Sequence, residues 1–186
     1  MMPQHQEQLA ILAFGSLIWA PEPELDAVVA DRIHGVKTPF NVEFARSSSS
    51  RGYGPTLVRV KNGGAEVKGM LLAIKDGVTA DETTAIMSKR ERGAHISRLS
   101  DFQGFKTVLF ADPVQNIEDP TASALATLAI ESIKLSEPGR DGITYLMDAK
   151  EAGIVTPLVD SYEKEILLKT STRSLDRARK LLSRGS

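Results

Sequence analysis

The sequence predicts an α+β fold, because strand-like segments dominate its first part and helical segments its last. The 186 residues are enough for a sizeable core, and we expect a single domain over residues 1–186. Strands followed by helices favour a curled sheet or barrel with helices packed against it. Within this domain, residues 1–7 are expected to be a loose tail and residues 172–186 a terminal helix.

The composition is ordinary for a globular protein, with 41% apolar residues, 25% charged residues and a net charge of −1. Because there is no basic excess, we expect no nucleic acid and no membrane surface as a partner. No apolar run approaches the roughly 18 residues that a membrane-spanning helix needs. The polar N-terminus lacks a signal-peptide pattern, so we expect a cytoplasmic protein. The lack of cysteine excludes disulfides, thiol catalysis and cysteine metal sites.

The first structured segment is the apolar run Leu9–Phe14, which Gly15 and Ser16 interrupt. A run this short, with a β-branched residue at Ile11, suits a buried strand better than a helix. A glycine directly after the strand lets a ligand approach the backbone amides closely. The pattern therefore leaves two interpretations open, a ligand-binding loop or a structural turn after a buried strand.

The remaining elements follow from hydrophobic periodicity and turn residues. We expect strands over 32–45, 56–61, 65–75 and 102–111, helices over 80–92, 141–152, 157–170 and 172–183, and a short helix or turn over 24–30. Asn62-Gly63-Gly64 predicts a hairpin between the second and third of these strands. Gly35 and Pro39 predict a bulge in the first. Residues 122–133 fit either a helix or a strand.

The helix expected at 80–92 has clear end signals. Thr79 and Glu82 have capping-box spacing at its start. Gly93 is expected as the residue after its C-cap. Lys89, Arg90 and Arg92 place cations near the negative end of the helix dipole.

Glu91, at the end of this helix, is the strongest candidate for proton transfer. It shares a helix face with Met87, so it points inward if that face is buried. Burial and the negative helix end would both disfavour the carboxylate anion, whereas the basic neighbours would favour it. The pattern therefore fits a proton-exchanging carboxylate or a solvated Arg-Glu-Arg at a helix end.

Other chemistry-bearing residues carry weaker patterns. The three histidines, His5, His34 and His95, lack partners at metal-ligand spacing, so no metal or cofactor is expected. Ser16 lacks the second glycine of a nucleophile elbow. The loop 46–54 is rich in serine and arginine, which fits a carboxylate-binding loop or a flexible surface loop.

Two motifs, taken together, resemble those of the ChaC-like γ-glutamylcyclotransferases. Phe14-Gly-Ser-Leu-Ile-Trp19 resembles the family's Tyr-Gly-Ser-Leu-Ile-Trp opening, and Arg90-Glu-Arg-Gly93 resembles its Arg-Glu-Lys-Gly, which carries the catalytic glutamate. The serine-rich loop with Thr56-Leu-Val58, and the stretch from Asp141 to Ile154, are similar to later family segments. This sequence departs from the pattern at Phe14, where the family has tyrosine, and at Arg92, where it has lysine.

The resemblance implies a small mixed β-barrel with helices packed around it and a helical C-terminus. It also implies an enzyme that releases 5-oxoproline from a γ-glutamyl peptide, such as glutathione, or from a γ-glutamylamine. In this interpretation Glu91 is the general base and then the general acid, and Phe14, Gly15, Ser16 and Leu17 bind the substrate. The substrate's α-amine attacks its own γ-carbonyl carbon, so no water, metal or cofactor takes part.

Two further hypotheses stay open on the sequence. The missing tyrosine hydroxyl at Phe14 motivates a non-catalytic ligand-binding or interaction domain on the same scaffold. A hydrolase or amidotransferase would instead use Ser16 as its nucleophile. Finally, the apolar side of the last helix leaves a homodimer open.

Overall fold

The computed structural model describes residues 8–185, so the tail predicted at 1–7 lies outside the described residues. These residues form two compact units. The first unit contains the chain up to Thr38 together with Lys68–Pro113, and the second contains Pro39–Val67 together with the chain from Val114 onward. The expectation of a single domain over 1–186 stays a prediction.

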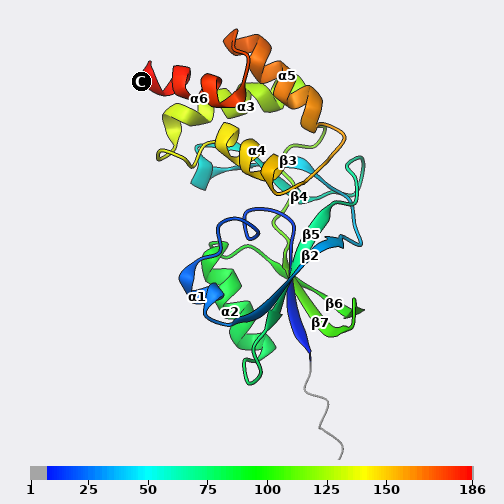
Figure 1. Cartoon of the computed structure of the whole chain (residues 1–186). Coiled ribbons are helices and arrows are strands. Elements are labelled where there is room, and N and C mark those ends of the chain that lie inside the picture. The colour runs from blue at the N-terminus through cyan, green and yellow to red at the C-terminus, as the bar shows by residue number, and fades with distance from the viewer. Residues whose placement is uncertain (1–7, 186) are drawn as a thin grey trace, which may run out of the picture. The chain divides into compact units, whose positions relative to one another are not determined.

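The first unit is a five-stranded mixed sheet with two helices (Figure 1). Its strands follow the order β2-β5-β1-β7-β6. The elements are β1 (Leu9–Ala13), α1 (Pro23–Asp26), β2 (Val29–Lys37), β5 (Lys68–Ile74), α2 (Ala80–Arg90), β6 (Ile96–Phe102) and β7 (Phe105–Ala111). Central strand β1 is buried along its whole length and pairs antiparallel with β5 and parallel with β7.

The core of this unit forms on one face of β1. Leu9, Ile11 and Ala13 alternate along the strand and pack with Leu25 of α1 and Met87 of α2. Side chains of a strand alternate between its two faces, and this run is apolar throughout because both faces are buried. The prediction for the first strand is confirmed to within one residue at each end.

The second unit is a two-stranded antiparallel sheet with four longer helices (Figure 1). Its elements are β3 (Val42–Ser48), the 3-10 turn η1 (Ser49–Arg51), β4 (Gly54–Arg59), α3 (Ala122–Leu135), α4 (Gly142–Glu151), α5 (Val159–Thr170) and α6 (Leu175–Arg184). The ambiguous stretch 122–133 is a helix, because its buried residues recur at helical spacing at Leu125, Ala126 and Ala129. Thr121 caps it by accepting the Ala124 amide at 3.3 Å.

A buried carboxylate connects β3 to the segment before α5. Glu43 is 3% exposed and accepts hydrogen bonds from the Phe44 amide at 2.9 Å, from Thr156 Oγ1 at 2.5 Å and from the Leu158 amide at 3.3 Å. Next to it, Phe44 packs edge-on against Tyr162 with ring centroids 5.3 Å apart. A carboxylate with three donors can remain buried, so Glu43 has a structural role here.

Two strand predictions need correction. The expected strand 32–45 is two strands, β2 and β3, which lie in different units and different sheets. The expected strand 102–111 is β7, which begins only at Phe105 because Gln103 and Gly104 adopt positive φ in a hairpin turn, and the sequence analysis did not predict its partner β6. The bulge predicted near Gly35 is confirmed by a shift in the β2–β5 register between His34 and Val36.

The hairpin predicted at Asn62-Gly63-Gly64 is wrong. Both glycines have positive φ, as a turn requires, but β4 pairs with β3 and β5 pairs with β1 and β2. A side chain at Gly64 would meet the Val42 carbonyl oxygen at 2.6 Å, so glycine lets the chain pass close to β3. The turn was therefore identified correctly, and its strand partners were not.

The α+β class is confirmed, and the barrel detail stays a prediction because the two sheets have no strand in common among the described residues. On the last helix, Leu175 and Ala178 are buried, whereas Leu181 is 54% exposed, so its expected apolar side packs only in part. Within residues 8–185, no helix is both long and apolar enough to cross a membrane.

Removing the cap of α2 is expected to destabilise the first unit. The Thr79 hydroxyl accepts the Glu82 amide at 3.2 Å, and the Glu82 carboxylate accepts the Thr79 amide at 2.8 Å. Thr79→Ala should therefore lower the free energy of unfolding by about 1 kcal/mol in urea titrations. An unchanged unfolding midpoint would contradict this role.

The same cap predicts a pH dependence. Hydrogen bonds from Thr79 lower the pKa of Glu82 below its usual value. The stabilisation is thus present above the unfolded-state pKa and lost as the pH falls through the lowered folded-state pKa. Glu82→Gln keeps the capping geometry and does not titrate, so its stability should fall less steeply than that of the unmodified protein in acid.

Gly69 on β5 leaves no room for a side chain. A Cβ there would lie inside contact distance of the Ala13 carbonyl oxygen, on the neighbouring strand β1. Gly69→Ala should destabilise the protein by about 2 kcal/mol, because the paired backbone cannot move away. The control Lys68→Ala changes an exposed neighbour and should stay within about 0.5 kcal/mol of the unmodified protein in thermal unfolding. Equal unfolding midpoints for the two variants would refute this.

Candidate active site

The loop after β1 is a pair of overlapping turns. The Ile18 amide donates to the Gly15 carbonyl at 2.9 Å, and the Ala20 amide donates to the Ser16 carbonyl at 2.8 Å. Among the described residues, the hydrogen bonds found do not use the amides of Gly15, Ser16 or Leu17. Free amides on a tight turn are able to bind oxygen atoms of a ligand.

Glu91 lies at the end of α2, in the same unit as this loop. It is the C-cap of the helix, and its amide donates to the Met87 carbonyl at 2.9 Å. Arg92 then adopts a left-handed conformation with φ 53°, and the Gly93 amide returns to the Ser88 carbonyl at 2.8 Å. This is a Schellman motif in which Arg92, rather than the predicted Gly93, follows the C-cap, so the helix ends two residues early.

Arg90 connects the loop to the glutamate. Its Nη1 donates to Oε1 of Glu91, and its Nη2 donates to the Ala20 carbonyl at 2.8 Å and to Ser16 Oγ at 3.3 Å. The side chains of Arg90 and Glu91 are only 10% and 22% exposed. The expectation of a solvated Arg-Glu-Arg is therefore wrong for these two residues, although Arg92 is exposed.

The structure thus brings Ser16 and Glu91 to one guanidinium, which the sequence did not predict. The sequence assigns Arg90 no contact with the loop, only a place beside Glu91 in the motif and near the negative end of the helix dipole. The Glu91 hydrogen bonds found within the described residues engage Oε1 and leave Oε2 available to a ligand. A carboxylate with one fixed oxygen and one available oxygen can accept a proton and return it.

The other predicted loop residues are more buried. Phe14 is 6% exposed and packs on Phe110 with ring centroids 6.4 Å apart, and Leu17 is also 6% exposed, within the core. The side chains of Phe14 and Leu17 pack into the protein interior on either side of the loop residues Gly15 and Ser16, which are half-buried. Trp19, expected in the core or at a pocket wall, is half-buried as well.

Ser16 does not have the surroundings of a nucleophile. Its hydroxyl is in contact with the guanidinium of Arg90, which only donates hydrogen bonds and stays protonated. A serine nucleophile needs a base that removes its proton. The contact therefore favours a positioning role for Ser16 over hydrolase chemistry.

The remaining candidates do not join this site. His34 and His95 are exposed, and His5 lies outside the described residues. In residues 8–185 there is no group of three His, Asp or Glu side chains that could hold a metal. The loop 46–54 belongs to the second unit, where Arg46 donates to the Val114 carbonyl at 2.5 Å and the Arg51 guanidinium lies 4.6 Å from the Tyr145 ring centre.

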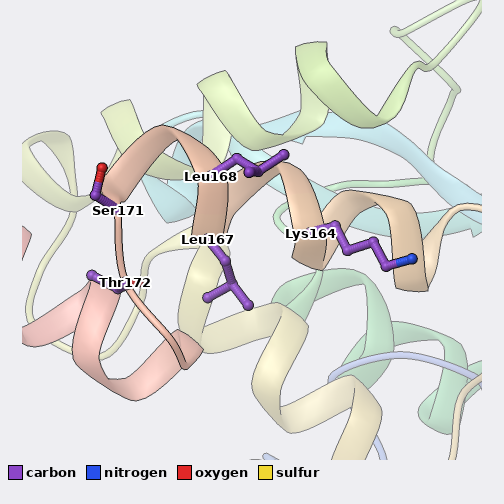
Figure 2. A pocket seen from close by; sticks show the side chains of 5 residues that line it. All are labelled: Lys164, Leu167, Leu168, Ser171 and Thr172. Atoms are coloured by element: carbon purple, nitrogen blue, oxygen red, sulfur yellow. The ribbon is translucent and has the colours of Figure 1, made fainter.

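A pocket of about 480 Å³ lies elsewhere in the second unit (Figure 2). Its lining follows the end of α5 and the segment toward α6 and comprises Lys164, Leu167, Leu168, Ser171 and Thr172. No residue predicted from the sequence to act in catalysis or binding lines it. We therefore do not place the reaction there.

Comparison with known proteins identifies the fold. No family model matches the chain, and no curated protein matches it in sequence. Among solved structures it is similar to a gamma glutamyl cyclotransferase from yeast that is specific to glutathione, with a TM-score of 0.58. The match has 14% identity and covers 86% of this chain and 97% of the yeast chain. The protein therefore has the γ-glutamyl cyclotransferase fold.

Proposed function

We propose that the protein is a γ-glutamylcyclotransferase-like enzyme that releases 5-oxoproline from a γ-glutamyl compound. The observation that carries this proposal is the Arg90 bridge, which holds the glycine-serine loop and Glu91 together. The fold supports it, because the similar yeast protein acts on glutathione. The substrate is a γ-glutamyl peptide, with glutathione the first to test, or a γ-glutamylamine.

The proposed reaction is an intramolecular aminolysis. The α-ammonium of the substrate gives one proton to the Oε2 atom of Glu91, and the free amine attacks the γ-carbonyl carbon. A carbon–nitrogen bond closes the lactam while the original amide carbon–nitrogen bond breaks. As the ring closes, the attacking nitrogen loses its second proton. The departing amine takes up this proton together with the one that Glu91 returns and leaves as an ammonium, so atoms and charges balance without water or a cofactor.

The loop supplies binding and orientation in this proposal. The amides of Gly15, Ser16 and Leu17 would bind oxygen atoms of the γ-glutamyl group, where no protein acceptor was found for them among the described residues. Holding the substrate folded on itself removes much of the entropic barrier to ring closure. The buried side chains of Phe14 and Leu17 would fix the loop against the core.

Replacing the proposed acid/base tests the mechanism directly. Glu91→Gln should lower kcat for 5-oxoproline release by about 100-fold or more, because the amide cannot accept the proton. The measurement is mass detection of 5-oxoproline from glutathione, γ-glutamyl dipeptides and γ-glutamylamines. Glu24→Gln, on the exposed helix α1, is the matched carboxylate control and should keep full activity.

The outcomes separate the competing functions. Full activity of Glu91→Gln would refute its role as acid/base. Tight γ-glutamyl binding without any turnover of the panel by the unmodified protein would favour a binding domain on the same fold.

The serine hypothesis has its own test. Ser16→Ala should lower kcat/KM by about 10-fold or less, because it removes one 3.3 Å contact to Arg90 and leaves the amides in place. A nucleophilic serine would instead lose essentially all activity and would form an acyl-enzyme with substrate. Steady-state kinetics and intact-protein mass spectrometry distinguish the two.

A further inference from the structure

We propose that Arg90 is a positioning residue that sets both the conformation of the Gly15–Ala20 loop and the orientation of the Glu91 carboxylate. This inference rests on the proposed function for its catalytic consequence. Its structural part, the tether between loop and helix end, rests only on the contacts of Arg90. These contacts reach across 70 and 74 residues of sequence to Ala20 and Ser16.

The guanidinium of Arg90 has a geometry that suits a positioning role. It is planar and rigid, so one nitrogen on Glu91 and another on the loop fix the two groups relative to each other. A lysine ammonium is a point charge and could not hold both in a defined orientation. The position therefore requires arginine specifically if the two groups must act together.

The burial of the Arg90 side chain is a poor way to stabilise the fold. The Arg90 side chain is only 10% exposed, and its Nε atom is buried without a hydrogen-bond partner among the described residues. Burying a charge and leaving a donor unpaired both oppose folding. Such exceptions are expected where function constrains the site, because an apolar residue would pack there more favourably.

The contacts of Arg90 leave the groups that would bind a substrate available. Arg90 engages Oε1 of Glu91 and the carbonyl of Ala20, and the loop amides of Gly15, Ser16 and Leu17 are not used by it. The tether thus fixes the carboxylate and the loop without occupying the groups that would contact a substrate.

The test compares Arg90→Met with Lys89→Met. Methionine keeps much of the aliphatic length of arginine and removes the guanidinium. Lys89 has an equal charge on the same helix end, but it is exposed and pairs with Glu24 rather than with Glu91. Both variants lose one cation, so a difference between them reports the specific contacts of Arg90.

Hydrogen exchange measures the tether without relying on activity. The amides of Ile18 and Ala20, which close the two turns, should exchange faster in Arg90→Met and at the normal rate in Lys89→Met. Unchanged exchange at these amides in Arg90→Met, with the variant folded by circular dichroism, would overturn the tether.

Kinetics measures the consequence for the reaction. Arg90→Met should lower kcat/KM by roughly 10- to 100-fold, with the loss more in kcat than in KM, because the Glu91 carboxylate loses its fixed orientation. Arg90→Lys should also leave kcat low, because it restores the charge and not the rigid fork. Lys89→Met should match the unmodified enzyme.

The outcomes distinguish this inference from the proposed function. If the unmodified protein is active and Arg90→Met matches Lys89→Met in kcat and KM, Arg90 is not a positioning residue, although the function stands. If the unmodified protein turns over no γ-glutamyl compound, the proposed function fails, together with the catalytic consequence of the tether. In that case faster exchange at Ile18 and Ala20 would still support the tether as a structural feature.

Discussion

The first unit depends on the burial of β1 between two hydrogen-bonded neighbours. Every residue of Leu9–Ala13 is buried, and the strand pairs with β5 on one side and β7 on the other. Because the strand is hydrogen-bonded in a defined register on both sides, a shift by one residue would break its pairing with both neighbours. Its end is therefore fixed, and the loop that begins at Gly15 starts from a rigid point. Met87 of α2 packs into the same core, so the helix end that carries Glu91 is fixed by the same burial.

Two glutamates show how differently this chain treats a buried carboxylate. Glu43 is 3% exposed, and three donors engage both of its oxygens, so its hydrogen bonds are made within the protein. The Glu91 side chain is 22% exposed, and the bonds found among the described residues hold only Oε1. A carboxylate whose two oxygens are both hydrogen-bonded inside the protein serves the fold, whereas one with an available oxygen can exchange a proton. This contrast favours Glu91 over Glu43 as the reactive group.

Local rules predicted the local features of the candidate site well. The strand before the loop, the capping box at Thr79 and the helix that ends near Glu91 all follow from short-range hydrogen bonding and hydrophobic period. The end of α2 departs from what these local rules predict. Glycine is the usual left-handed residue there, yet Arg92 takes that conformation and Gly93 follows it. An error of one residue at this helix end changes which way the Glu91 side chain points.

The sequence by itself determined the α+β class, most of the elements and the turn at Gly63 and Gly64, because these depend on neighbours along the chain. The tertiary structure alone decided that β4 pairs with β3 instead of β5, since pairing depends on which distant strands share a core. It also decided the role of Arg90, which resembles any cation at a helix end until it contacts Ser16 and Ala20. Contacts between residues so far apart in the sequence leave no periodic or spacing signal, so only the folded chain reveals them.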